Sequence, residues 1–70
     1  MTQIISFYMN GEPYQIKEKL TLLDLLLYFN YNDSLLVIEY NNLICNKRNW
    51  DTIFIKDQDK IEIVTIVGGG

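Results

Sequence analysis

Three glycines close the chain, and the chemistry they could support is that of the α-carboxylate on Gly70. They follow directly on the apolar, strand-like segment 61–67, IEIVTIV. Because glycine has no Cβ, Gly68 and Gly69 can thread a narrow channel with little steric hindrance. Three residues reach at most ~10 Å beyond a folded body. The pattern predicts a flexible tail, residues 68–70, that presents its carboxylate to another protein's active site; the alternative is an inert, frayed terminus.

Other reactive groups are scarce in the rest of the chain. It has no histidine, and its carboxylates are too scattered to form a metal-ligand cluster. Cys45 is the only cysteine, so no intrachain disulfide can form, which indicates a reducing compartment. Its surroundings, Leu43-Ile44-Cys45-Asn46, are typical of a short strand in which a cysteine is a small buried side chain. We therefore expect no catalytic residue, no metal and no permanently bound cofactor.

Size and charge narrow the range of partners. A chain of 70 residues makes one domain near the lower size limit for independent folding, with little room for a deep substrate cavity. The formal charge of −3 argues against nucleic-acid binding. No apolar run approaches the ~20 residues of a membrane span, and the N-terminus lacks the basic region of a signal peptide. We expect a location in the cytoplasm or the plastid stroma, since the abundant isoleucine, asparagine and tyrosine fit an AT-rich genome.

The first elements are predicted from local patterns. Ile5 to Met9 and Tyr14 to Lys17 alternate with period two on either side of Asn10-Gly11, the strongest short signal for a β-hairpin. Pro13 stands at the start of the second strand, where a missing donor is tolerated. The side chains expected to face the core are Ile5, Phe7, Met9, Tyr14 and Ile16.

A helix follows, beginning after Thr21. Thr21-Leu22-Leu23-Asp24 matches a capping box in which Asp24 replaces the commoner glutamate. The predicted buried stripe consists of Leu22, Leu25, Leu26 and Phe29, at helical spacing. Leu23 and Leu27 lie off this stripe, so either neighbouring loops cover them or they form a partner surface.

The remaining chain is predicted to be mostly strand. Residues 35–40 fit a central strand; a turn at Asn41-Asn42 leads to the short strand 43–45. The polar connection 46–52 carries Trp50 over an edge of the core, and 53–55 is expected as another short strand before the turn 57–59 and the final strand 60–67.

The main elements therefore follow the order β-β-α-β-β-β. With the first and last strands parallel and adjacent in the centre, and one helix covering one face of a mixed sheet, residues 1–67 form an α+β domain of the β-grasp (ubiquitin-like) type.

Alternation along the final strand assigns its two faces. Burying Glu62 without a partner would cost several kcal/mol, so Ile61 and Ile63 must face the core, with Thr65 and Val67 on the same side. Val64 and Ile66 then lie on the outer face with Glu62. Either they are ordinary exposed aliphatic residues, or they dock the domain on a partner while the glycines enter its catalytic site.

The chain resembles the ThiS family, the sulfur-carrier proteins of thiamine (thiazole) biosynthesis. The resemblance runs from Asn10-Gly11-Glu12 through residues 21–26 and 37–41 and Trp50 into the final segment 59–70, DKIEIVTIVGGG, which is its most specific part. Two features depart from the family pattern. Gln58 stands in a turn where relatives commonly have glycine, and many relatives end in two glycines instead of three.

The resemblance implies a carrier protein, not an enzyme. An adenylating enzyme similar to the ubiquitin-activating enzymes (ThiF) would consume ATP to convert the Gly70 carboxylate to an acyl adenylate. A cysteine desulfurase or another persulfide donor would then supply sulfur, leaving a thiocarboxylate on Gly70. Thiazole synthase (ThiG) would accept that sulfur.

Three alternatives stay open at this point. The small subunit of molybdopterin synthase is similar in fold and terminal glycines, although it is usually longer. A ubiquitin-like modifier would use the same first activation step. From a different class, a passive β-grasp binding module of the TGS type would carry an inert tail.

Overall fold

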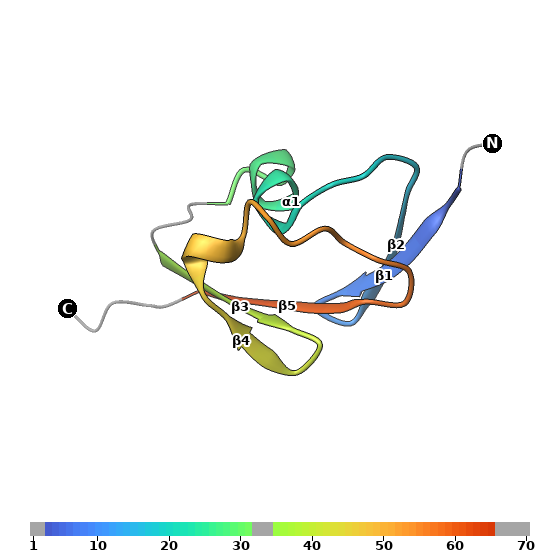
Figure 1. Cartoon of the computed structure of the whole chain (residues 1–70). Helices are drawn as coiled ribbons and strands as arrows, with labels where there is room; N and C mark the ends of the chain where they lie inside the picture. Colours follow the sequence, from blue (N-terminus) through green and yellow to red (C-terminus); the bar gives the residue numbers. More distant parts are fainter. Residues whose placement is uncertain (1–2, 32–34, 66–70) are drawn as a thin grey trace.

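The protein forms a five-stranded mixed sheet with one α-helix, and the computed structural model describes residues 3–31 and 35–65. Strands β1 (Ile5–Met9) and β2 (Glu12–Ile16) precede helix α1 (Leu22–Tyr28), and β3 (Leu36–Tyr40), β4 (Leu43–Cys45) and β5 (Lys60–Thr65) follow it (Figure 1). A short 3₁₀ helix spans Lys47–Asn49. The strand order is β2-β1-β5-β3-β4, in which only β1 and β5 run parallel.

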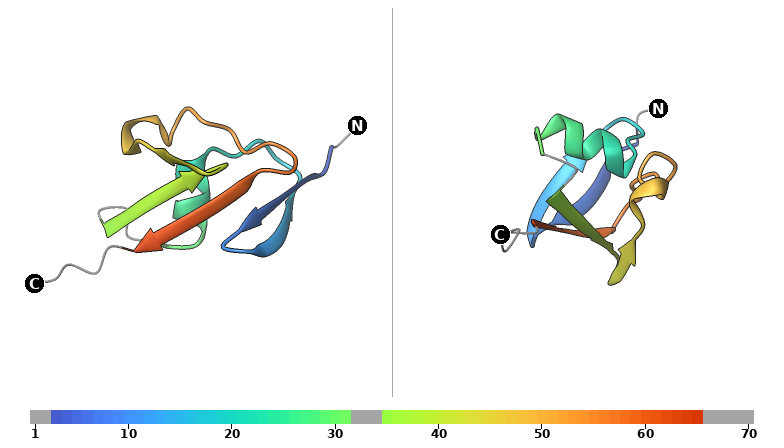
Figure 2. Two further views of the ribbon diagram at one scale, coloured as in Figure 1. Left: turned by 90° about the horizontal axis from the view of Figure 1, so that it is seen from below. Right: turned by 90° about the vertical axis from the view of Figure 1, so that its left-hand side faces the viewer.

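This arrangement confirms the predicted α+β class. Helix α1 lies across one face of the sheet together with the segment between β4 and β5 (Figures 1 and 2). The first and last strands are adjacent, with Tyr8 paired to Lys60 and Met9 to Ile61. One mixed sheet with a helix on one face and a central parallel pair is the β-grasp fold.

The N-terminal hairpin forms as its sequence predicts. Met9 pairs with Glu12, and the two connecting residues Asn10 and Gly11 have φ of 53° and 82°, as a two-residue hairpin turn requires. The side chain of Asn10 also accepts a hydrogen bond from the Ile63 amide at 2.8 Å. The hairpin turn is therefore tied directly to the central strand β5.

Both predicted halves of the capping box are present at the start of α1. The Asp24 amide donates to Thr21 Oγ1 at 3.1 Å, and the Thr21 amide donates to the Asp24 carboxylate at 3.0 Å. The next two orphan donors of the helix, the amides of Leu22 and Leu23, bond the carbonyls of Ile53 and Trp50, each at 3.0 Å.

That use of the backbone explains why the predicted strand at 53–55 is absent. Phe54 makes only an isolated bridge with Thr21. The Ile53 carbonyl caps the helix and the Ile55 amide donates to the Leu20 carbonyl, so neither group is available to a strand ladder. The prediction of a strand here was wrong because the segment's hydrogen bonds go to the start of α1.

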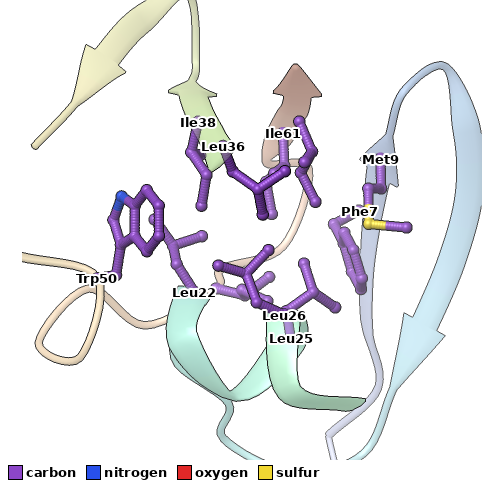
Figure 3. Close-up of a cluster of buried hydrophobic side chains, with 11 residues drawn as sticks. Phe7, Met9, Leu22, Leu25, Leu26, Leu36, Ile38, Trp50 and Ile61 are labelled. Atoms are coloured by element: carbon purple, nitrogen blue, oxygen red, sulfur yellow. The ribbon is translucent and has the colours of Figure 1, made fainter. Parts of the chain in front are cut away.

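The core lies between the sheet and α1 (Figure 3). Phe7, Met9, Leu36, Ile38, Ile61 and Ile63 reach it from the sheet, and Leu22, Leu25, Leu26, Trp50 and Ile55 close it from the other side. Trp50, which the sequence places over an edge, is instead a full core residue, only 2 % exposed. Its indole N–H donates to the Cys45 carbonyl at 3.1 Å, which makes complete burial possible.

The helix stripe is shorter than its spacing predicts. Phe29 follows the last turn of α1 and is partly exposed, packed edge-on against Tyr14 with ring centroids 5.6 Å apart. Leu23 packs partly against the core, which confirms its cover by neighbouring segments, whereas Leu27 stays exposed.

Candidate functional site

Strand β5, which leads toward the glycine tail, is held on both sides. It pairs with β3 from Tyr40↔Ile61 to Leu36↔Thr65, and with the end of β1 at Lys60 and Ile61. The Asn10 side chain continues the β1 side by accepting from the Ile63 amide. The strand is thus fixed in register up to Thr65.

The predicted alternation of β5 is confirmed over the described residues. Ile61 and Ile63 are buried, whereas Glu62 and Val64 are exposed, Val64 by 49 %. Thr65 alternates to the core side but is exposed, because it lies in the last pair of the β3–β5 ladder. Ile66, Val67 and the predicted tail, Gly68, Gly69 and Gly70, lie outside the described residues.

Val64 belongs to a sheet face that no element covers in the described part of the chain (Figure 2). Register places Val37 directly opposite Val64, and Glu39 opposite both Glu62 and Ile44. Ile44 is 75 % exposed on the edge strand β4. The face therefore carries an aliphatic row, Val37–Val64, beside a second row that combines two carboxylates with Ile44.

Asp59, in the turn before β5, is a structural residue that sequence reasoning missed. Its carboxylate is buried and accepts from the Tyr40 hydroxyl at 2.5 Å, the Lys56 amide at 2.7 Å and the Asn41 side-chain amide at 3.1 Å. Asn41 in turn accepts from the Lys60 amide at 2.8 Å. These bonds fix the point at which β5 begins.

The same cluster changes the chemistry of Tyr40. Burial, followed by the hydrogen bond with Asp59 and the charge of its carboxylate, raises the pKa of the Tyr40 hydroxyl above its ordinary value of 10.0. Tyr40 therefore acts as a neutral donor to the turn. No spacing rule separates Asp59 from the neighbouring Asp57, which is exposed and accepts instead from the Ser6 amide at 2.9 Å.

Gln58, the residue at which the family pattern commonly has glycine, has a left-handed backbone with φ of 70°. Its amide donates to the Ser6 carbonyl at 2.6 Å. Glycine adopts this conformation without the Cβ clash that glutamine must tolerate. The departure therefore bears on the stability of this turn.

The described surface offers little chemistry of its own. Within residues 3–31 and 35–65, no three His, Cys, Asp or Glu side chains gather where they could hold a metal ion. The Cys45 side chain is only half-buried, although the sequence favoured burial, and desolvation raises the pKa of its thiol, which disfavours the nucleophilic thiolate. No helix in these residues is long and apolar enough to cross a membrane.

Comparison with known proteins agrees with this geometry. The sequence profile of the ThiS family matches residues 7–70. The chain is 33 % identical to the sulfur carrier protein ThiS of Bacillus subtilis over 63 residues, covering 89 % of this chain and 96 % of that protein. It is 60 % identical over 65 residues to the uncharacterized protein ycf40 of Trieres chinensis, covering 93 % and 89 %.

Two further comparisons extend the likeness. A segment amounting to 20 % of the thiazole synthase of Magnetococcus marinus is 26 % identical to 94 % of this chain. The crystal structure of the thiamine biosynthesis protein ThiS from Geobacter metallireducens superposes with a TM-score of 0.81 and 25 % identity, covering 94 % of this chain and all of that one. With a family profile that spans nearly its whole length and a matching β-grasp structure, the chain belongs to the ThiS family.

Proposed function

We propose that this protein is a sulfur carrier of thiamine biosynthesis, which receives sulfur on the carboxylate of Gly70 and delivers it for the thiazole ring. The observation that carries the proposal is the fixed position of β5. Its register is set by β3, by β1 and by the Asn10 side chain, and Gly70 is only the fifth residue after its last described residue, Thr65. Five residues span at most ~18 Å, so the domain can deliver the carboxylate to a site near its docking surface.

The chemistry begins with activation, because a carboxylate is a poor electrophile. In the proposed route a Gly70 oxygen attacks the α-phosphorus of ATP on a ThiF-like adenylating enzyme, and pyrophosphate leaves. The terminal sulfur of a persulfide, formed by a cysteine desulfurase or a similar donor, attacks the carbonyl carbon, and AMP leaves. A thiol then cleaves the sulfur–sulfur bond and becomes a disulfide, which releases the thiocarboxylate. The carrier supplies no acid or base and is regenerated as a co-substrate.

Thiazole synthase is the proposed acceptor of the sulfur. The supporting observation is that the thiazole synthase of Magnetococcus marinus contains a segment similar to 94 % of this chain. Placing the two on one polypeptide raises their effective concentration for each other. A free carrier would meet the same enzyme by docking instead.

The outer face of β5 is the proposed docking surface. Val64 is half-exposed there beside Val37, and by alternation Ile66 would extend the row toward the tail. Val64→Asp and Ile66→Asp are expected to raise the Kd for the adenylating enzyme at least tenfold with unchanged thermal unfolding. Calorimetric titration would measure this, with Thr65→Asp as the control on the opposite face. Equal affinity for all variants would exclude docking through this row.

The proposed location is the plastid stroma; the support is the composition typical of an AT-rich genome together with the 60 % identity to the ycf40 protein of Trieres chinensis. The proteome of isolated plastids from the source organism would show the carrier there.

Intact-mass spectrometry tests the function directly. Incubation with the ThiF-like enzyme, ATP and a persulfide donor is expected to increase the mass by the difference between one sulfur and one oxygen atom, located at Gly70 by fragmentation. Gly70→Val and Gly69→Val should fold normally but fail in ATP–pyrophosphate exchange, because a β-branched side chain crowds the attacked carbon. A wild-type chain whose end stays unmodified, or variants that exchange normally, would refute the proposal.

A further inference from the structure

Two carboxylates face each other on the open side of the sheet. The β3–β5 ladder pairs Glu39 with Glu62, and directly opposed side chains in such a ladder have Cβ atoms about 4.5–5.5 Å apart. Opposed like charges destabilise a sheet. Lys60 lies on the same face, two residues before Glu62, but among residues 3–31 and 35–65 neither carboxylate forms an ion pair with it. The isolated domain thus carries an electrostatic cost at the centre of its uncovered face.

The surroundings of this pair are mostly apolar, although Lys60 lies on the same face of β5, two residues before Glu62. The Val37–Val64 row borders it toward the end of β5, and Ile44 stands directly beside Glu39. Val64 and Ile44 are 49 % and 75 % exposed, while Val37 and Glu39 are half-buried by their neighbours. A partner that covers these aliphatic side chains must also remove water from the two carboxylates.

The charge of the pair selects the chemistry of that partner. Lys60 offers one positive charge on this face, which leaves at least one of the two carboxylates without a counter-charge. Covering an unpaired carboxylate would cost several kcal/mol, so the partner must bring a positive group to the pair. A guanidinium is the best match, because its planar fork offers N–H groups to two acceptors at once and it loses hydration more readily than an ammonium. A second copy of this face would bring four carboxylates together, and nucleic acid or an anionic lipid surface would be repelled by them.

We infer that the open sheet face, centred on the Glu39–Glu62 pair, receives an arginine side chain of the adenylating partner, with Val37, Val64 and Ile44 sealing the contact against water. The identity of the partner rests on the function proposed above. The pairing lies on the strand that leads to the tail, so the charge contact would set the register of docking while the aliphatic row contributes apolar area.

The inference predicts that removing the two charges stabilises the fold but weakens binding to the partner. The double variant Glu39→Gln/Glu62→Gln removes the repulsion, so its urea midpoint should rise, but it also removes the acceptor charge. Its Kd for the source organism's ThiF-like enzyme should rise at least tenfold in calorimetry at low salt. Raising the salt should weaken wild-type binding and leave the double variant nearly unchanged.

A charge-matched control separates this local contact from net charge. Glu12→Gln/Glu18→Gln makes the same change in charge at exposed positions of β2 and the following loop, away from the open face. It should leave both the urea midpoint and the Kd within twofold of wild type. An equal loss of affinity in this control would show a general charge effect and overturn the inference.

The remaining outcomes also decide the question. If wild type is adenylated and Glu39→Gln/Glu62→Gln binds as tightly, the arginine contact is refuted while the carrier function stands. If wild type neither binds nor is adenylated, both proposals fail together. Each arginine at the enzyme's interface can also be changed to methionine, one at a time. One of these enzyme variants should bind the wild-type carrier as weakly as it binds Glu39→Gln/Glu62→Gln. If none of them does, the arginine contact is refuted.

Discussion

The turn before β5 provides the sharpest prediction, because its hydrogen bonds depend on the order of donors and acceptors. Asp59 Oδ2 accepts from the Tyr40 hydroxyl and the Lys56 amide, and Asp59 Oδ1 accepts from the Asn41 side-chain amide. Asn41 Oδ1 accepts from the Lys60 amide. Exchanging the two side chains, as Asn41→Asp/Asp59→Asn, preserves every acceptor and reverses the one bond between them.

The magnitudes follow from the bonds each single variant loses. Asp59→Asn keeps an oxygen for Tyr40 and Lys56 but removes the charge, which costs about 1 kcal/mol for each bond. It also turns an NH₂ group toward the NH₂ group of Asn41, which leaves the buried donor at position 59 unpaired at about 1 kcal/mol more. Asn41→Asp instead opposes two carboxylates, and we expect a smaller loss of about 2 kcal/mol. Asparagine and aspartate both tolerate the φ of 51° at position 41.

The double variant should recover part of this loss. Its loss in free energy of unfolding should be smaller than the sum of the two single losses by at least ~1 kcal/mol, since the reversed bond is complementary again. Urea unfolding at pH 7 would measure all four proteins, with the buried Trp50 as the fluorescent probe. The free energy of unfolding of a domain of this size is only ~3–5 kcal/mol, so each single variant should shift the urea midpoint substantially. Strict additivity, or an Asp59→Asn loss below about 0.5 kcal/mol, would refute the proposed donor–acceptor order.

Two further predictions concern neighbouring residues. Folding raises the pKa of Tyr40, so the contribution of its hydroxyl to the free energy of unfolding is fully present below the unfolded value of 10.0 and is lost as the pH rises further. Between pH 9 and about pH 11, urea titrations should therefore show a larger loss of stability for wild type than for Tyr40→Phe. Equal losses would show that the hydroxyl does not titrate differently on folding. Gln58→Gly should raise the free energy of unfolding by up to ~1 kcal/mol by relieving the left-handed backbone, whereas Gln58→Ala should not; a loss with glycine would mean that chain entropy outweighs the strain.

The sequence was informative wherever the interaction is local. The Asn10-Gly11 turn, the Thr21–Asp24 capping box and the alternation of β5 each depend on residues a few positions apart, and the structure confirms all three. The core role of Trp50 and the missing strand at 53–55 depend on the start of α1, about 30 residues earlier in the chain. Spacing within a segment cannot show that a distant helix takes its carbonyls.

In the candidate site, too, the local features could be predicted from the sequence and the long-range ones could not. Exposure of Val64 followed from Glu62 by alternation alone, and the structure confirms it. The opposition of Glu39 and Glu62 required the β3–β5 register, which a shift of one residue would replace with a different pair. Likewise, Asp57 and Asp59 are equivalent in sequence, and only the approach of Tyr40 and Asn41 distinguishes the buried carboxylate.

The proposed function explains why docking and delivery would share one strand. Fixing the backbone of each residue in a channel costs about 1–2 kcal/mol, so three glycines would cost about 3–6 kcal/mol before any chemistry occurs. Glycines make few side-chain contacts that could offset this cost, and the folded body must supply the difference. Covering one valine or isoleucine side chain contributes about 1.5–3 kcal/mol, so the aliphatic residues of the open face are sufficient in magnitude. A carrier with weakened docking should therefore show a raised KM for adenylation, while its kcat at saturation stays near that of wild type.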